Sequence, residues 1–197
     1  MIVAGGEIVR IVGGEFRGRV LQSPQGSATR PTSDRTREAV FNILHHAKWR
    51  RGDLVGDARV LDVFAGTGAL GLEALSRGAQ HAVFVEREYA AARLCQENID
   101  ALGLGERALL LKFDGLHPVP RPLYIEPRTL VFLDPPYGKG MAAQALSGLA
   151  KTDWLKPGAV CVVEMARKQP EAAPPGFVQH DERAYGVTAV KFLEWPG

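Results

Sequence analysis

The pattern of hydrophobic and polar positions changes character near residue 59 of this 197-residue chain. From there on, short apolar runs alternate with segments of helical periodicity. The runs are RVLDVF, AVFVE, ALLLKF, TLVFLD and GAVCVVEMA, and the helical segments span 69–77, 88–101 and 140–150. Strands that are apolar throughout and separated by helices are typical of a mostly parallel sheet covered on both faces. We therefore expect an α/β fold.

Two further pairs of apolar segments lie outside this alternation. Residues 8–12 and 16–21 flank Gly13-Gly14-Glu15, which predicts a β-hairpin with a glycine turn. Near the other end, strands at about 177–183 and 187–194 are separated by a short connection. We expect these last two strands to pair antiparallel.

A helix is expected between the hairpin and the sheet. Thr32 or Ser33 can cap its first turn, and the apolar spacing carries it to about Lys48. We accordingly divide the chain into an N-terminal β-hairpin and basic arm, residues 1–31, and a main domain, residues 32–197.

Composition limits the class of protein. Hydrophobic residues make up 46% and charged residues 23%, which suits a globular chain with one substantial core. Cys95 and Cys161 lack the spacing of a disulfide framework or a zinc site, so we expect reduced thiols and no metal. No apolar run approaches membrane-spanning length and no signal-peptide pattern is visible, so we expect a cytoplasmic protein without a membrane partner. Nothing demands more than a monomer.

Charge is distributed unevenly along the chain. Residues 1–51 hold nine Lys or Arg against four acids, whereas residues 52–197 hold 15 against 18. A basic arm ahead of a mildly acidic body favours a polyanionic partner, although a solvated basic face would give the same count.

The segment LDVFAGTGALGLEAL contains a GxGxxG pattern between a strand and a helix. Gly66, Gly68 and Gly71 permit a tight turn and a close approach of ligand to main chain. Glu86, twenty residues after Gly66, ends the next strand, where its carboxylate can accept bonds from both hydroxyls of a ribose. These features fit a nicotinamide dehydrogenase as well as an enzyme that uses S-adenosylmethionine (SAM).

Acids at successive strand ends favour SAM. Asp62, inside the first strand, can reach the ammonium of a methionine moiety but would repel a pyrophosphate. Asp114 follows the third strand, where it can accept a bond from an adenine amino group. Because open α/β sheets bind ligands at the carboxyl ends of their strands, we expect Asp62, Glu86, Asp114 and Asp134 to converge on one crevice.

The stretch FLDPPYGKG follows the fourth strand and predicts a clamp for an amine. The nitrogen lone pair of an exocyclic amine is delocalised into its ring, so acceptors must orient the NH₂ group toward the methyl donor. Asp134 and the carbonyl of Pro135 supply two acceptors, and Pro135 and Pro136 restrict the backbone. Tyr137 offers a ring on which a flipped base can stack.

Together these motifs resemble one family. DxFxGxG followed by DPPY is similar to SAM-dependent amino-methyltransferases in general. With RIVGGEFRGRVL, RPTSDRTREAVFNIL, LDVFAGTGALGLEALSRGA and YGVTAVKFLE, the chain resembles the RsmD-type guanine-N2 methyltransferases of bacterial small-subunit (16S) ribosomal RNA. The resemblance implies a Rossmann-like class I SAM-dependent methyltransferase fold, with a seven-stranded, mostly parallel sheet and an N-terminal β-hairpin extension. It also implies methylation of one guanine on the assembled or assembling 30S subunit.

The resemblance assigns roles to individual positions. SAM would be bound by Thr32, Asp62, Phe64, Ala65, Gly66, Thr67, Gly68, Glu86, Arg87, Asp114 and Gly115. The catalytic clamp would comprise Asp134, Pro135, Pro136 and Tyr137. The charge of the basic arm, next to a domain that modifies nucleotides, predicts the contacts with ribosomal RNA: Arg17, Arg19, Arg30, Arg35, Arg37 and Lys139, although Lys139 fits a flexible surface lysine equally well. Arg17 and Arg19, two apart on an expected strand, should project from one face.

Three alternatives remain open. A DNA adenine-N6 methyltransferase or a protein glutamine methyltransferase would share the clamp, although the chain has no room for the target-recognition domain of a DNA enzyme. A ribosome-assembly factor could bind SAM and RNA without catalysis, but it would not need the acceptors of DPPY. The sequence leaves open which guanine is modified, whether naked RNA suffices, and whether the proton is lost to Asp134 or to water.

Overall fold

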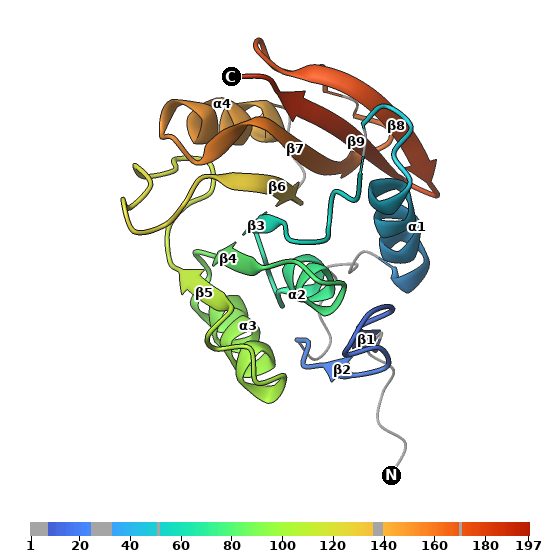
Figure 1. Cartoon of the computed structure of the whole chain (residues 1–197), viewed down its shortest axis with the longest axis vertical. Coiled ribbons are helices and arrows are strands. Elements are labelled where there is room, and N and C mark those ends of the chain that lie inside the picture. Colours follow the sequence, from blue (N-terminus) through green and yellow to red (C-terminus); the bar gives the residue numbers. More distant parts are fainter. Residues whose placement is uncertain (1–7, 25–32, 51, 136–139, 170) are drawn as a thin grey trace.

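The computed structural model describes residues 8–24, 33–50, 52–135, 140–169 and 171–197. Seven strands form the main sheet: β3 (Arg59–Val63), β4 (His81–Val85), β5 (Ala108–Leu111), β6 (Arg128–Leu133), β7 (Leu155–Ala166), β8 (Val178–Tyr185) and β9 (Thr188–Trp195). Their order is β5-β4-β3-β6-β7-β9-β8 (Figure 1). The first five strands in this order, from β5 to β7, run parallel to one another, and β9 is antiparallel to both β7 and β8. The expected seven-stranded, mostly parallel sheet is confirmed.

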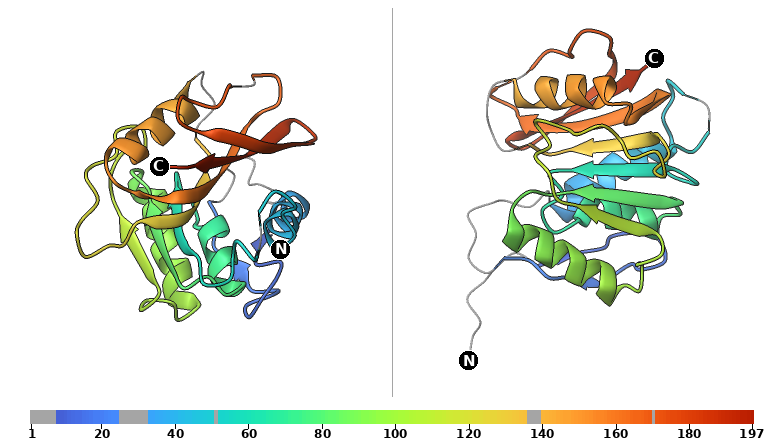
Figure 2. Two further views of the ribbon diagram at one scale, coloured as in Figure 1. Left: turned by 45° about the horizontal axis from the view of Figure 1, so that its top comes forward. Right: turned by 90° about the vertical axis from the view of Figure 1, so that its left-hand side faces the viewer.

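Helices cover both faces of this sheet: α1 (Asp34–His45), α2 (Ala69–Ser76), α3 (Tyr89–Ala101) and α4 (Met141–Lys151). The first three contribute to one hydrophobic cluster, in which the rings of Phe41 and Phe132 lie 5.5 Å apart. The second cluster, on the opposite face, joins α4 to Trp154. In the right-hand view of Figure 2, α4 lies in front of the strands and α1 behind them. Burial of both faces explains why the strands are apolar throughout.

Helix boundaries follow the sequence closely. Ser33, rather than Thr32, caps α1, and its Oγ accepts a hydrogen bond from the backbone N–H of Thr36 at 3.2 Å. The helix ends at His45, three residues before the expected Lys48. No helix in the described segments is long and apolar enough to cross a membrane.

The N-terminal hairpin pairs β1 (Val9–Arg10) with β2 (Val20–Leu21) in a separate antiparallel sheet. Its strands are much shorter than expected, and residues 11–19 form a broad connection instead of a tight glycine turn. The reason is that the N–H groups of Val12, Glu15 and Phe16 bond to α2, although those of Ile11 and Gly18 still bond across the hairpin. Arg17 therefore lies in a turn, and the expectation that it shares a strand face with Arg19 is wrong.

Candidate functional site

The candidate site lies at the carboxyl ends of the parallel strands, beside β3, where the direction in which successive strands are added to the sheet reverses. The strand after β3 in sequence, β4, lies on one side of it, and β6 lies on the other. Crevices at such switch points are the usual ligand sites of open α/β sheets. The structure brings the four predicted acids to this edge: Asp62 in β3, Glu86 after β4, Asp114 after β5 and Asp134 after β6.

The glycine turn after β3 leaves the main chain open on one side. Gly66 has a φ of 55°, and a Cβ added there would meet no atom within 4 Å. Gly71, in contrast, is needed for packing, because a Cβ there would lie 2.4 Å from the ring of Phe84 in β4. The turn thus combines tight helix–strand packing with a cradle that a ligand can fill.

Glu86 fixes the glycine turn. Its two carboxylate oxygens accept backbone hydrogen bonds, one from Gly66 at 2.9 Å and one from Glu88 at 2.8 Å. Each oxygen retains a second lone pair, so the carboxylate can still accept two hydroxyl donors.

Asp62 is buried and held in one orientation. Its Oδ2 accepts a hydrogen bond from the backbone N–H of Gly71, in the first turn of α2, at 2.9 Å. Burial raises the pKa of Asp62 to about 7, the charge of Glu86 acts in the same direction, and the Gly71 bond opposes both. A cation bound beside Asp62 would favour its ionised form.

Asp114 lies in a more polar environment. Its carboxylate accepts from the backbone N–H of Leu116 at 3.0 Å, contacts the His117 ring at 3.2 Å and pairs with Arg87 at 3.1 Å. The Leu116 bond is the main cause that lowers the pKa of Asp114. A negative charge is therefore maintained at this end of the crevice.

The residues between these acids are closely packed. Phe64 has a φ of 63°, a conformation that bulky residues seldom adopt and that marks a constrained turn. A Cβ added to Gly115 would lie 2.9 Å from the Phe64 ring, so the two segments approach closely. The backbone of Ala65 donates to Val85 at 3.1 Å, and the carbonyl of Thr67 accepts from Asn98 at 3.0 Å.

Asp134 directly follows β6, and it is only partly exposed. Burial is the main cause that raises its pKa well above the usual range, and the charges of Glu164 and Asp62 add to the effect. Pro135 is buried beside it. The remaining predicted residues that cannot be placed lie outside the described segments: Arg30, Thr32, Pro136, Tyr137 and Lys139.

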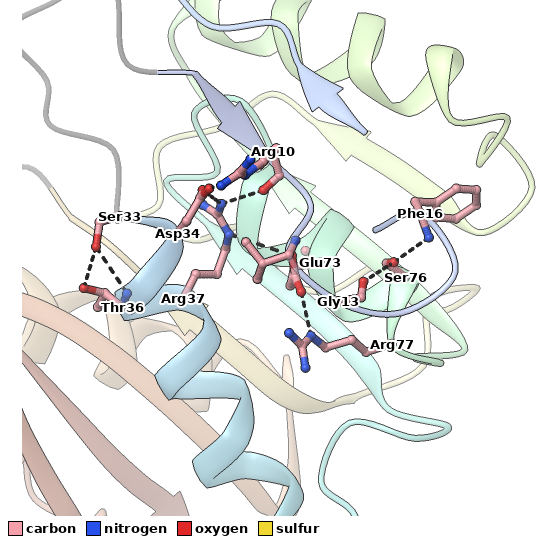
Figure 3. Close-up of polar contacts among 12 residues, drawn as sticks. Arg10, Gly13, Phe16, Ser33, Asp34, Thr36, Arg37, Glu73, Ser76 and Arg77 are labelled. Carbon is pink, nitrogen blue, oxygen red and sulfur yellow. Dashed lines mark hydrogen bonds and ion pairs between the residues drawn. The ribbon is translucent and has the colours of Figure 1, made fainter. Parts of the chain in front are cut away.

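The hairpin docks on the outer surface of α2 (Figure 3). The backbone N–H of Val12 donates to Glu73 Oε2 at 2.7 Å. Ser76 bridges the hairpin connection, since its Oγ donates to the carbonyl of Gly13 at 2.6 Å and accepts from the N–H of Phe16 at 2.9 Å. The basic arm is thereby anchored to the helix that begins at the glycine turn.

Arg37 belongs to this docking contact. Its side chain is 1% exposed; its Nη2 donates to the carbonyl of Arg10 and to Asp34, both at 2.7 Å, and its Nε lies 3.8 Å from Glu73. An arginine buried in this way cannot reach a phosphate, so the prediction that Arg37 contacts RNA is not supported. Arg17, Arg19 and Arg35 are exposed.

Sequence reasoning missed Glu73 and Ser76 in α2 and Glu164 in β7. The signal was present for the two glutamates, because a glutamate inside an otherwise apolar helix or strand requires a partner.

The sheet order, the glycine turn and the acids at successive strand ends define a Rossmann-like class I methyltransferase fold. The model of the family described as "conserved hypothetical protein 95" matches residues 9–194, and the chain belongs to this family. Ribosomal RNA small subunit methyltransferase D of Haemophilus influenzae is 34% identical over 187 residues, covering 94% of this chain and 93% of the relative. This similarity confirms the resemblance inferred from the motifs.

Solved structures agree. The Escherichia coli protein yhhF, assigned as a methyltransferase, has a TM-score of 0.79 at 33% identity, covering 95% of this chain and 98% of that one. An RNA methyltransferase from Salinibacter ruber, in complex with S-adenosyl-L-homocysteine, has a TM-score of 0.61 at 16% identity, covering 85% and 94%. The second likeness concerns the fold alone.

Proposed function

We propose that this protein transfers a methyl group from SAM to the exocyclic N2 amine of a guanine in small-subunit (16S) ribosomal RNA. The observation that carries the proposal is that Asp134 and Pro135 directly follow β6, the parallel neighbour of the strand that leads into the glycine turn. We propose that these two residues supply the acceptors for the amine. The relatives named ribosomal RNA small subunit methyltransferase D support ribosomal RNA as the substrate class. We propose the assembled or assembling 30S subunit as the form of that substrate.

The residues present fit SAM. Glu86 would accept the ribose hydroxyls, Asp62 would face the methionine ammonium, and Asp114 with Gly115 would border the adenine. The open side of Gly66 gives the ligand access to the main chain. SAM supplies a methyl group on a positively charged sulfur, and the acidic edge suits that charge, whereas it would repel the pyrophosphate of a nicotinamide cofactor.

The clamp would act by orientation. Asp134 and the carbonyl of Pro135 would accept the two N–H groups of the guanine amine and aim its lone pair at the methyl group. Pro136 and Tyr137 complete the proposed site, with the ring stacking on the flipped base. Positioning of this kind supplies up to roughly 7–11 kcal/mol of the barrier in the best-aligned reactions.

The basic arm would bind phosphates. Arg17 and Arg19 are exposed on the docked hairpin, and Arg35 is exposed on the first turn of α1. Arg30 is another proposed contact. Lys139, directly after the clamp, is a further proposed contact. Exposed arginines bind the phosphate groups of RNA, so their presence favours an RNA substrate over a protein substrate.

The test uses radiolabelled SAM and small ribosomal subunits from cells that lack this protein, followed by nucleoside analysis. Naked ribosomal RNA, duplex DNA and total protein are treated in parallel. We expect label in N2-methylguanosine from subunits. Label in N6-methyladenosine or in protein would overturn the substrate and keep the amine clamp. Bound SAM without label in any of the four would favour a non-catalytic assembly factor.

A further inference from the structure

Two large apolar side chains lie almost fully in solvent at the tip of the loop that precedes β6. Leu123 is 95% exposed and Tyr124 is 79% exposed. This loop, residues 119–127, is the yellow segment between β5 and β6 in Figure 1. Exposed hydrophobic residues are normally scattered singly over a surface, so two neighbours of this size at one tip point to an interaction surface.

The tip is a turn with a fixed conformation. Leu123 and Tyr124 are its central residues, and the backbone N–H of Ile125 closes it by donating to the carbonyl of Pro122 at 2.9 Å. Ile125 is buried in the hydrophobic cluster beneath α4. The turn is therefore anchored in the core while its two central side chains remain in water. A loop that is already ordered loses little entropy when a partner binds to it.

Both ends of the loop are attached to the segment that leads into β7. The indole N–H of Trp154 donates to the carbonyl of Val119 at 2.8 Å, and the carbonyl of Trp154 accepts from the backbone N–H of Arg128 at 2.8 Å. The Nε of Arg121 donates to the carbonyl of Asp153 at 2.6 Å. The display of the tip is thus built into the fold.

Positive charge gathers beside this loop, at the amino edge of the sheet. Arg59, His81 and Arg128 are the first residues of β3, β4 and β6. Arg128 is buried, its Nε donates to the carbonyl of Glu126 at 2.7 Å, and its Nη1 lies 3.4 Å from the His81 ring. Arg59 forms an ion pair with the carboxylate of Glu126. Bases therefore mark the amino edge of the sheet, whereas acids mark its carboxyl edge.

The pKa values of two groups agree with this excess of positive charge. Burial is the main cause that lowers the pKa of Arg128 to about 10, and the charges of Arg59 and Arg121 act in the same direction. Burial and the charge of Arg128 also lower the pKa of His81. The other charged residues of the segments that meet here are all exposed: Lys151, Lys156, Asp57, Glu126 and Asp153. The three arginines and two lysines thus outnumber the acids.

An exposed tyrosine beside an excess of basic residues is complementary to RNA. Unpaired bases stack on aromatic rings, and arginine and lysine attract the phosphates between them. Tyr124 offers the ring, and Leu123 extends the apolar surface on which a base can lie. A protein pocket would suit Leu123 equally well, but it would gain nothing from the positive charge of this edge.

We propose that the loop 119–127 is a second RNA-binding surface, on which an unpaired base of small-subunit ribosomal RNA stacks on Tyr124 while Arg59, Lys151 and Lys156 attract its phosphates. This inference rests on the proposed function for the choice of RNA. The surface and the amine clamp lie at opposite edges of the sheet. The five residues of β3 alone separate these edges by about 16 Å. The surface therefore binds a nucleotide other than the target guanine.

The test measures binding of RNA without methyl transfer. Fluorescence anisotropy gives the affinity for a labelled oligoadenylate of twelve nucleotides, and filter binding gives the affinities for naked 16S ribosomal RNA and for small subunits. Tyr124→Leu keeps an apolar side chain but removes the ring, and it should weaken binding of all three by about fivefold or more. Tyr124→Phe keeps the ring and should match the wild type. Val178→Ala, at an exposed position of β8, is the matched control and should also match the wild type.

Several outcomes would overturn the proposal. Unchanged affinity for oligoadenylate and naked RNA in Tyr124→Leu would remove the stacking surface. A loss confined to intact subunits would identify a ribosomal protein as the partner instead. A wild-type dimer that dissociates when Leu123 and Tyr124 are both replaced by serine would identify a second copy of this chain. The expected loss of RNA affinity, together with no methylation of 16S ribosomal RNA by the wild type, would overturn the proposed function and leave this surface intact.

Discussion

The backbone N–H of Val12 donates to the carboxylate of Glu73 at 2.7 Å, across 61 positions of the sequence. Glu73 is fully buried and also binds Arg77 through Oε1 at 2.6 Å. One side chain on α2 thus pairs with the arginine that follows this helix and fixes the N-terminal hairpin. The basic arm is a docked part of the domain, and its arginines are presented from a defined position.

Replacement of Glu73 by glutamine should destabilise the protein strongly. The amide keeps the size of the side chain but removes the negative charge beside Arg77 and beside the buried Arg37, which keeps its ion pair with Asp34. Breaking a buried ion pair from one side costs about 3–5 kcal/mol of unfolding free energy. Urea unfolding measures the change. Glu97→Gln, which removes a surface pair with Arg93, is the control and should cost less than about 1 kcal/mol.

Gly14→Ala should loosen the hairpin. Gly14 has a φ of 77°, and a Cβ there would lie 1.9 Å from the main-chain oxygen of Ser76. Gly18 has a φ of 86° but open space around its Cβ position, so Gly18→Ala isolates the backbone strain, about 1–2 kcal/mol. Gly14→Ala should cost a further 1–3 kcal/mol or so from the overlap. Equal urea midpoints for the two variants would show that the hairpin yields without loss.

Replacing Arg17 and Arg19 together by alanine should weaken RNA binding and reduce its dependence on salt. Each lost phosphate contact lowers the slope of log affinity against log salt by about 0.7–0.9. Filter binding of ribosomal RNA at several salt concentrations gives this slope, and SAM affinity should not change. Arg93→Ala with Arg183→Ala, two exposed arginines on α3 and β8, should leave the slope as it is. A slope that is unchanged in the hairpin variant would remove these residues from the RNA surface.

Asp134→Ala should abolish turnover and retain SAM binding. Loss of the amine acceptor should lower kcat by about 100-fold or more. Asp134→Asn keeps an acceptor oxygen but cannot take up a proton, so it should lie between alanine and the wild type. Single-turnover assays with subunits measure the rate. If the protein is a binding factor without catalytic activity, no methylation should be detected in the wild type or in either variant.

The pKa of Asp62 predicts a dependence of stability on pH. Because burial raises this pKa from 3.8 to about 7 in the folded state, the contribution of Asp62 to stability is full below about pH 4 and is lost as the pH rises through 7. The loss amounts to at most about 4 kcal/mol. Asp62→Asn, whose amide oxygen can still accept from Gly71, should lack this decline. Urea unfolding of both proteins between pH 4 and 8 tests it, and parallel curves would contradict the assignment.

The sheet could be predicted because its strands carry their own signal. Runs such as TLVFLD are buried on both sides, so periodicity and length together indicate parallel strands, and the acids that follow them mark the carboxyl edge. The position of β9 between β7 and β8 was not predictable, because antiparallel pairing of the last two strands fits either order. The hydrophobic pattern alone does not determine which of the last two strands lies next to β7.

The docking of the hairpin on α2 also could not be predicted from the sequence. Residues 11–19 read as strand and turn because the pattern assumes that main-chain groups pair across the hairpin. In the structure Glu15 and Phe16 bond to Ser76, more than fifty residues away. Arg37 was misjudged for the same reason, since an arginine on a helix reads as exposed until its partner on another helix is known.

The order in which the sheet can be assembled follows from the place of β9. β8 pairs with β9 alone, and β7 depends on β9 for its outer partner. While residues 188–195 remain inside the ribosome that makes the chain, β8 has no partner and Glu164 lacks the neighbour that holds its strand from outside. The nascent chain can fold its glycine turn and hairpin early, but the strand that follows the amine clamp gains its outer partner only when residues 188–195 leave the ribosome.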